Sequence, residues 1–341
     1  MPVTETNSHS SHSKDQGKYR VLVTGAGGFI GSHLVEACVA QGWQVRAMVR
    51  YNSRSHRGWL NESSVTDKIE VISGDVRDYD SVARAIDGCQ TVFHLAALIG
   101  IPYSYVSPLA YIRTNVEGTY NILESARVLK IPKVLITSTS ETYGTAQYVP
   151  MDERHPASAQ SPYAASKVAA DQLALSYYRS FGLPVRVVRP FNTFGPRQSA
   201  RAFIPTVISQ ILHNQRPIQL GSLAPTRDYT YVKDTVAAFL ALAQSDDFDG
   251  LPVNVGIGTE ISMGNLVQRI SALMGTEIEV TTASERLRPV ESEVERLVCD
   301  SGRMRKLTSW RPQYDLDTGL QETIDWVRAH QSDFKVGSYT V

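Results

Sequence analysis

The sequence predicts an α/β protein with a doubly wound, Rossmann-type parallel sheet and a smaller C-terminal lobe that binds substrate. Short apolar runs alternate with stretches of helical periodicity in the first half of the 341 residues, and a glycine cluster follows the first run. In the second half this alternation breaks down, and proline and arginine become denser. We therefore expect a Rossmann domain over 18–190 and a mainly substrate-binding lobe over 191–341, with 229–258 partly returning to the Rossmann domain.

The composition is that of an ordinary globular protein without net charge. Hydrophobic residues make up 42%, enough for a large core, and 34 Lys and Arg balance 34 Asp and Glu. No basic run is long enough for a nucleic-acid or membrane patch, and no apolar stretch reaches membrane-spanning length. We therefore expect neither nucleic acid nor a membrane as a partner, and anionic ligands must be held by local arginines.

The N-terminal segment and the cysteines indicate the compartment. Residues 1–17 are rich in Ser, His, Thr and Asn and lack the apolar core of a signal peptide, so we expect a disordered tail. Cys38, Cys89 and Cys299 are scattered and odd in number, which suits packing in a reducing compartment and offers no metal-ligand spacing. The sequence thus predicts a cytoplasmic protein without a metal site.

The first strand, turn and helix predict nucleotide binding. An apolar strand over 19–24 leads into Gly-Ala-Gly-Gly-Phe-Ile-Gly, and a helical pattern follows. Glycines allow a tight turn and the close approach of a pyrophosphate to a helix N-terminus, although a glycine cluster alone can be a simple turn. Position 30 is Ile, so the six-residue dinucleotide fingerprint fails, and the spacing instead resembles that of the extended short-chain dehydrogenases/reductases. The candidate cofactor contacts are Gly25, Gly27, Gly28, Phe29, Ile30 and Gly31.

The next two strands end in further candidate cofactor residues. The strand over 44–49 ends in Arg50, where Rossmann domains often place an acid for the ribose hydroxyls. A guanidinium there would bind a 2′-phosphate and favour NADP, or it would be a solvated cation with NAD bound; the sequence leaves both open. The strand over 69–72 leads to Asp75 and Val76. The resemblance gives Asp75 a contact with the adenine edge, whereas the residues alone also allow a helix cap.

A fourth strand over 91–95 ends in Ala96 and Ala97, small residues that let a cofactor lie against the backbone. The loop expected over 99–108 carries Tyr103, a candidate sugar contact that could equally be a packing residue. An amphipathic helix is expected over 115–130.

The candidate catalytic residues follow the fifth strand. Thr139, Ser140 and Glu141 come after the apolar run over 134–136, at the carboxyl end where open α/β sheets bind ligands. Tyr163 and Lys167 lie four residues apart, on one face of an expected helix. An ammonium beside a phenol should lower the pKa of the phenol and make Tyr163 a usable base.

The same spacing recurs at Tyr229 and Lys233, which makes it weak evidence by itself. Those two residues lie in Asp-Tyr-Thr-Tyr-Val, whose alternation and β-forming residues predict a strand that would point the two side chains differently. The hydroxyl-bearing strand end and the glycine loop favour Tyr163 as the catalytic tyrosine.

The second half supplies candidate substrate contacts. We expect a strand over 185–188, a strand over 253–255 that rejoins the sheet, and helices over 203–213, 266–273 and 320–327. Arginines in separate loops suit a bidentate grip on a diphosphate, although each one alone is more often a surface cation. The candidate substrate residues in this half are Asn192, Arg201, Arg227 and Arg288, the last in an extended segment.

These motifs together resemble an extended short-chain dehydrogenase/reductase that acts on a nucleotide sugar, and the resemblance covers residues 19 to 330. The run Thr139-Ser-Glu141 is similar to that of GDP-mannose 4,6-dehydratases and UDP-glucuronate decarboxylases, whereas dTDP-glucose 4,6-dehydratases carry Thr-Asp-Glu. The sequence that follows Glu141 and the sequence around Asn192 are most similar to those of the LegB-type UDP-N-acetylglucosamine 4,6-dehydratases of bacterial amino-sugar pathways. The resemblance implies a tightly bound NAD or NADP, recycled in each turnover, and a homodimer through the helices at 115–130 and 163–179.

The implied chemistry starts with oxidation at C4 of the sugar, where Tyr163 takes the hydroxyl proton and Thr139 bonds the oxygen. The C5 proton then lies α to a ketone, and Glu141 is the candidate base. Loss of the C6 hydroxyl as water leaves an enone that accepts hydride at C6. Because Ser140 is a poor acid, Glu141 is also the candidate that protonates the leaving hydroxyl.

Two other readings stay open at this point. A decarboxylase or a 4-epimerase would use the same oxidised C4 intermediate. A dinucleotide-sensing protein without turnover would have no need of a base, its activator and an acid together, which argues against it.

Overall fold

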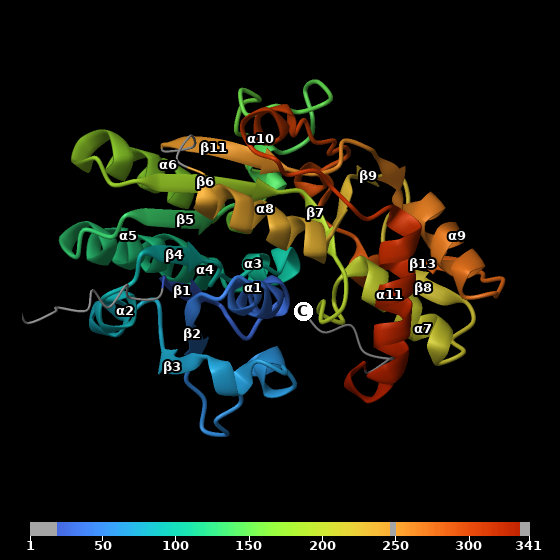
Figure 1. Ribbon diagram of the computed structural model, residues 1–341. Helices are drawn as coiled ribbons and strands as arrows, with labels where there is room; N and C mark the ends of the chain where they lie inside the picture. The colour runs from blue at the N-terminus through green and yellow to red at the C-terminus, as the bar shows by residue number, and fades with distance from the viewer. Residues whose placement is uncertain (1–18, 246–249, 335–341) are drawn as a thin grey trace, which may run out of the picture.

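The computed structural model describes residues 19–245 and 250–334, and a seven-stranded parallel sheet lies at its centre (Figure 1). The strand order is β11-β6-β5-β4-β1-β2-β3, so the direction of winding reverses between β1 and β4. Ligands bind at such a reversal, beyond the carboxyl ends of the strands. The predicted doubly wound sheet is confirmed. Its strands are β1 (Arg20–Thr24), β2 (Gln44–Arg50), β3 (Glu70–Gly74), β4 (Thr91–His94), β5 (Lys133–Thr137), β6 (Val185–Pro190) and β11 (Leu251–Val255).

Helices cover both faces of this sheet. One buried apolar cluster joins the sheet to α2 (Tyr79–Ile86), α5 (Gly118–Val128) and α6 (Pro162–Phe181). A second cluster joins its other face to α1 (Phe29–Ala40) and α8 (Val232–Gln244).

The second cluster continues without a break into the smaller lobe, at the right of Figure 1. This lobe contains α7 (Phe203–Leu212), α9 (Met263–Leu273), α11 (Leu316–Ala329) and the parallel pair β8 (Ile218–Leu220) and β13 (Val280–Thr282). Strand β11 returns to the main sheet beside β6, as expected for 253–255. The boundary between lobes at residue 190 stays a prediction.

Short elements connect the sheet and the smaller lobe. Two further pairs are β7 (Asn192–Phe194) with β10 (Tyr229–Tyr231), and β9 (Thr226–Arg227) with β12 (Ile261–Ser262). Helix α10 (Gly302–Leu307) lies beside β11. The strand predicted around Tyr229 is confirmed.

Helix α6 shows how local sequence sets the ends of an element. Ser161 is its N-cap and accepts a hydrogen bond from the backbone N–H of Ala164 at 3.1 Å. Pro162 occupies the first turn, where its missing N–H is not needed. Gly182 ends the helix in the left-handed conformation with φ +66°.

Three stretches differ from the sequence-based expectation. The loop expected over 99–108 contains α3 (Ile101–Val106) and leads into α4 (Pro108–Tyr111), because a proline opens each helix. The helix expected from 115 begins as a π-helix over Ile112–Glu117. The segment expected to be extended around Arg288 contains 3₁₀ turns at Ser284–Arg286 and Val290–Ser292.

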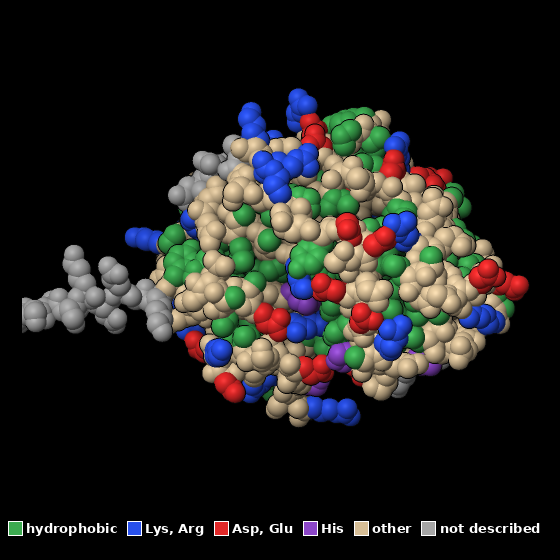
Figure 2. All heavy atoms as spheres, turned by 45° about the vertical axis from the view of Figure 1, so that its right-hand side comes forward, with side chains coloured by type: hydrophobic (Ala, Val, Ile, Leu, Met, Phe, Trp, Pro, Cys, Tyr) green, Lys and Arg blue, Asp and Glu red, His purple; other side chains and the backbone are tan. Residues whose placement is uncertain are grey.

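The surface carries interspersed charges of both signs on the face shown in Figure 2. Within 19–245 and 250–334, no helix is long and apolar enough to cross a membrane. The disordered tail expected at 1–17 lies outside the described residues.

Candidate active site

The glycine turn after β1 has the shape that a dinucleotide requires. Gly25 has φ +66°, and a Cβ there would lie 2.8 Å from the backbone nitrogen of Ala96. A Cβ on Gly31 would lie 2.2 Å from the Gly25 carbonyl oxygen. Gly28 is the N-cap of α1 and offers no side-chain cap, so the amides around Phe29 and Ile30 stay available to an anion. The turn therefore fits a pyrophosphate.

The loop after β2 packs directly on this turn. The Trp59 N–H donates to the Gly27 carbonyl oxygen at 2.9 Å, and a Cβ on Gly27 would lie 2.3 Å from the Arg57 carbonyl oxygen. A cavity of about 170 Å³ opens between this loop and β2 and β3, lined by Val49, Tyr51, Asn52, Ser55, His56, Arg57, Val71 and Ser73. Arg50 is exposed at the end of β2, next to this cavity.

Asp75 and Val76 follow β3, as expected. Asp75 pairs with Arg77, whose guanidinium lies 2.5 Å from its carboxylate, and this hydrogen bond helps hold the pKa of Asp75 below its usual range. Asp75, Arg77, Asp78, Arg113 and Glu117 line an open pocket of about 560 Å³. The helix-cap alternative for Asp75 is wrong, because Asp78 caps α2 by accepting from the Asp80 N–H.

Val76 and the two alanines shape the walls of this region. Val76 is buried, and its carbonyl oxygen accepts from the Asn121 side chain at 2.9 Å. Ala96 and Ala97 follow β4, and the close approach of Ala96 to Gly25 narrows the crevice between β1 and β4. The predicted cofactor residues from Gly25 to Ala97 therefore lie along the carboxyl edge of β1 to β4, whereas Tyr163 and Lys167, which were also predicted to contact the cofactor, lie on α6.

The predicted catalytic residues come together where β5 meets α6. Thr139 follows β5 and caps a 3₁₀ turn over Ser140–Tyr143, so Glu141 lies in the first turn. Tyr163 hydrogen-bonds to the Thr139 side chain, and the negative charge of Glu141 acts to raise the pKa of Tyr163. The Lys167 Nζ donates to the Thr137 carbonyl oxygen at 2.5 Å. One strand end and one helix face thus supply the whole set.

The expected lowering of the pKa of Tyr163 by Lys167 is wrong for the protein alone. Burial raises the pKa of Tyr163, and its hydrogen bond with Thr139 opposes that rise only in part. Burial lowers the pKa of Lys167 to about 8, against the opposing charge of Asp171. Desolvation is the largest cause of both pKa shifts, because both side chains are buried.

A buried ion pair between Asp171 and Arg189 lies next to the catalytic residues. Asp171 accepts from Ser138 Oγ at 2.8 Å and pairs with Arg189 at 2.9 Å. Arg189 also donates to the Tyr143 hydroxyl at 2.9 Å, and that hydroxyl donates to Asn254 at 2.7 Å. These contacts join β5, β6, β11 and α6 next to Thr139.

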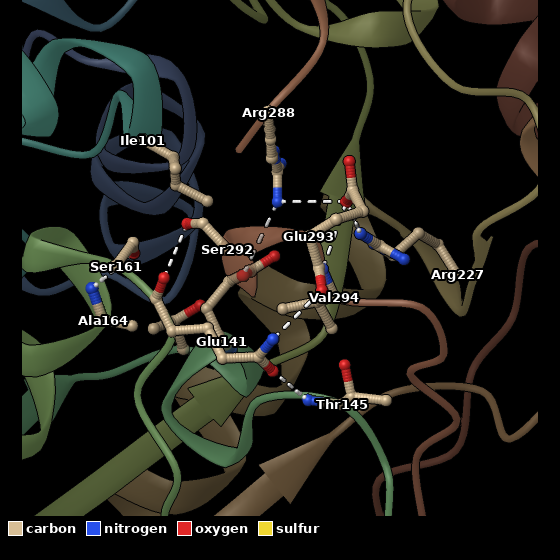
Figure 3. Close-up of polar contacts among 12 residues, drawn as sticks. Ile101, Glu141, Thr145, Ser161, Ala164, Arg227, Arg288, Ser292, Glu293 and Val294 are labelled. Carbon is tan, nitrogen blue, oxygen red and sulfur yellow. Dashed lines mark hydrogen bonds and ion pairs between the residues drawn. The ribbon is translucent and has the colours of Figure 1, made fainter. Parts of the chain in front are cut away.

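Two of the predicted substrate arginines converge on Glu293, and one of them, Arg288, also faces Glu141 (Figure 3). Arg288 Nη1 lies 3.9 Å from the Glu141 carboxylate and 3.5 Å from that of Glu293. Arg227 lies 3.3 Å from the same Glu293 oxygen, and its side chain is only 5% exposed. Glu293 therefore holds the two guanidinium groups on the same side of the site.

The other predicted substrate residues are more scattered. Tyr103 lies on α3, and its ring is 6.2 Å from that of Tyr111, which in turn is 6.2 Å from that of Tyr163. Asn192 begins β7, paired in register with Tyr229. Arg201 is exposed near Tyr111; burial raises the pKa of Tyr111 to about 12, and the charge of Arg201 opposes that rise.

The sequence-based interpretation missed Tyr111 and Glu293. Tyr111 stands edge-on to the Tyr163 ring and donates its hydroxyl to the Gly100 carbonyl oxygen. Glu293 follows Arg288 by five positions, but an acidic residue at that spacing does not by itself predict a contact with the arginine. The second Tyr and Lys pair with this spacing does not form a site of the same kind. The Tyr229 hydroxyl donates to Met263, and Lys233 pairs with Glu322 at 2.8 Å.

Comparisons with known proteins agree with this geometry. The model of the GDP-mannose 4,6 dehydratase family matches residues 22–323. A UDP-glucose 4-epimerase of Mycolicibacterium smegmatis is 33% identical over 314 residues, covering 91% of this chain and 98% of that protein. A UDP-N-acetyl-alpha-D-glucosaminuronate decarboxylase of Bacillus cytotoxicus is 32% identical, covering 93% and 100%.

A solved dTDP-glucose 4,6-dehydratase from Streptomyces venezuelae, with NAD and TYD bound, has the same fold. Its TM-score is 0.83 at 28% identity, and the match covers 92% of this chain and 98% of that one. The chain therefore belongs to the GDP-mannose 4,6-dehydratase family, within the extended short-chain dehydrogenases/reductases that modify nucleotide sugars as dehydratases, epimerases or decarboxylases.

Proposed function

We propose that this protein is a nucleotide-sugar 4,6-dehydratase that converts UDP-N-acetylglucosamine to the 4-keto-6-deoxy sugar with a retained NAD or NADP. The observation that carries the proposal is Glu141, a carboxylate beside the hydrogen-bonded pair of Tyr163 and Thr139. Its side chain is only 12% exposed, which distinguishes it from an exposed loop acid. Tyr163 and Thr139 suffice for oxidation and reduction at C4, so the carboxylate points to elimination.

Each residue has a defined task in this reaction. Tyr163 takes the proton of the C4 hydroxyl, and Thr139 bonds the same oxygen as it becomes a ketone. The turn of Gly25, Gly28 and Gly31 would hold NAD or NADP, which would supply the hydride acceptor and donor for the reaction. Lys167, held against the Thr137 carbonyl, places its charge on the same helix face as Tyr163.

Glu141 takes the C5 proton after C4 has been oxidised, because the ketone makes that proton acidic. The neutral carboxylic acid then donates a proton to the C6 hydroxyl, which leaves as water. Ser140 is only 2% exposed and cannot donate as a carboxylic acid would, so Glu141 serves in both steps.

The charges around Glu141 favour this reading over the decarboxylase. A uronic acid would bring its C6 carboxylate towards Glu141, and the two anions would repel each other. The nearby cation, Arg288, already faces both Glu141 and Glu293. A neutral C6 hydroxyl has no such conflict. The Bacillus cytotoxicus relative is named for a UDP-linked N-acetylated amino-sugar acid, which supports the UDP group and the N-acetyl group proposed here but not the C6 hydroxyl.

Glu141→Gln tests the proposal, because glutamine keeps the shape of the side chain but cannot accept a proton. With UDP-N-acetylglucosamine the variant should oxidise C4 and then stall. It should accumulate reduced cofactor, visible by absorbance, and exchange little C5 hydrogen in heavy water. Tyr163→Phe is the control, and it should accumulate no reduced cofactor.

Mass analysis of the products from UDP-, GDP- and dTDP-sugars separates the family activities. Loss of water indicates the dehydratase, loss of carbon dioxide the decarboxylase, and no change in mass the epimerase. Normal water loss and normal C5 exchange by Glu141→Gln would remove this residue from the mechanism.

A further inference from the structure

A series of hydrogen-bonded, buried polar side chains runs from the end of β1, beside the glycine turn, to the catalytic helix α6. Thr24, the last residue of β1, accepts from the backbone N–H groups of Leu95 and Ala96, both at 3.1 Å. Its hydroxyl lies 2.9 Å from His94 Nδ1. His94 Nε2 lies 3.2 Å from the Thr119 hydroxyl, which lies 2.6 Å from the Asn115 carbonyl oxygen.

The donor of each hydrogen bond in this series can be assigned by starting from Thr24 at one end and from Asn115 at the other. The Thr24 oxygen already accepts two N–H groups, so its proton points to His94 Nδ1. The Asn115 carbonyl can only accept, so the Thr119 proton points to it. Thr119 must then accept from His94 Nε2. His94 is therefore neutral and carries its proton on Nε2.

The surroundings of His94 agree with a neutral ring. Thr24, His94 and Thr119 are each at most 2% exposed. Burial lowers the pKa of His94 to about 3, and the charge of Lys167 acts in the same direction. A charged imidazole would also need an acceptor at Nδ1, where the Thr24 hydroxyl has both lone pairs occupied.

The far end of the chain meets the catalytic helix. Asn115 lies in the π-helix before α5, and its amide nitrogen donates to Leu98 O and Ser166 Oγ, both at 2.9 Å. Ser166 Oγ donates in turn to the carbonyl oxygen of Tyr163 at 2.7 Å. Local π-helical turns occur often at functional sites, and this one turns the Asn115 side chain towards α6.

We propose that His94, as the neutral Nε2–H tautomer, is a positioning residue that fixes the distance between the glycine turn and Tyr163. One end of the chain holds Ala96 against Gly25, and the other holds the first turn of α6. The part of the inference that concerns rate rests on the proposed oxidation at C4. The part that concerns the tautomer rests on the hydrogen bonds alone.

The tautomer is tested on the unmodified protein by nitrogen NMR of the histidine rings, with His94 assigned through its ring-to-backbone correlations. We expect an unprotonated Nδ1 and a protonated Nε2 from about pH 5 to pH 8, where an ordinary histidine would titrate. A proton on Nδ1, or a ring that becomes charged in this range, would overturn the inference.

The positioning role is tested by Thr119→Val, which removes the hydroxyl with little change in shape, and by Thr119→Ser, which keeps it. Reduction of the bound cofactor by nucleotide sugar should slow about tenfold in Thr119→Val, the size expected for one unsatisfied buried donor. The KM for the sugar should change less than about twofold, and Thr119→Ser should restore the rate. A residue that merely stabilises the fold would lower the melting temperature and leave this rate unchanged, which is the contradicting result.

The two proposals fail in different ways. If no nucleotide sugar reduces the cofactor of the wild type, the proposed function is wrong, and the NMR result still decides the tautomer. If the wild type reduces its cofactor and Thr119→Val does so equally fast, only the positioning role of His94 is wrong.

Discussion

Lys167 should set the alkaline limit of activity, because it is buried near Tyr163 with its pKa lowered to about 8. The ammonium is lost as the pH rises through that value, so kcat/KM should fall above about pH 8. Stability should respond in the opposite direction. An unfolded lysine keeps its proton up to its ordinary value of 10.5, so between the two values the unfolded state binds more protons and stability rises with pH.

Asp171→Asn provides the matched test of this limit. The charge of Asp171 opposes the lowering of the Lys167 pKa, so its removal should move the alkaline limb of the kcat/KM profile to lower pH. Asp325→Asn, which changes an exposed carboxylate on α11, should leave the limb in place. If the alkaline limb of the kcat/KM profile stays at the same pH in Asp171→Asn, a group other than Lys167 determines it.

Arg50→Asp tests whether the end of β2 distinguishes the two cofactors. A 2′-phosphate near Arg50 would lose a cation and meet an anion, so affinity for NADP should fall at least about tenfold relative to NAD. Competitive titration of the wild type and the variant gives this ratio. If the ratio stays the same, Arg50 is only a solvated cation.

At the residue scale, the sequence predicted what lies in short motifs and missed what depends on tertiary contacts. Thr139, Glu141, Tyr163 and Lys167 could be recognised because each motif spans a few residues of one strand end or helix face. Glu293 could not, because its role depends on two arginines from separate segments. The direction of the Tyr163 pKa was missed for the same reason, since burial is not visible in local spacing.

At the scale of elements, the capping hydrogen bond of α6 should matter for activity as well as stability. Ser161→Ala removes the bond to the Ala164 N–H, next to Tyr163 in the first turn, and should cost about 1 kcal/mol of stability. Ser262→Ala is the control, because Ser262 caps α9 with the same 3.1 Å bond to Asn265. Denaturant unfolding should show similar losses, while kcat should fall only in Ser161→Ala. An equal kcat in both variants would contradict this.

Most helices and strands were predictable because apolar periodicity sets them locally. The α3 and α4 helices were missed, although each has a proline in its first turn, where proline is favoured. The π-helix before α5 was not predictable, since it is fixed by contacts of Asn115 with Leu98 and Ser166.

At the scale of the whole molecule, we still predict a homodimer through α5 and α6. Leu123 and Tyr177, two of the larger side chains on these helices, are buried within one chain and cannot form its surface. Tyr120 and Phe181 are 44% and 58% exposed and are better candidates. Sedimentation should show a dimer at micromolar concentration, and Tyr120→Glu should weaken it because a charge would be buried.

Leu251→Glu is the control for this prediction. Leu251 is 41% exposed at the start of β11 and belongs to neither helix, so a charge there should leave the association unchanged. A monomeric wild type, or equal effects of the two substitutions, would contradict the proposed interface.

The meeting of Glu141 with Arg288 also has a consequence for synthesis on the ribosome. Strands β1 to β6 and Tyr163 all precede Arg288, the arginine that faces Glu141, in the order of translation. Residues 295–300 then bond back to the stretch around 145–151, which ties the late segment to the early one. The residues of the glycine turn and of the strand ends that would hold the cofactor are therefore synthesised well before the arginine that faces Glu141.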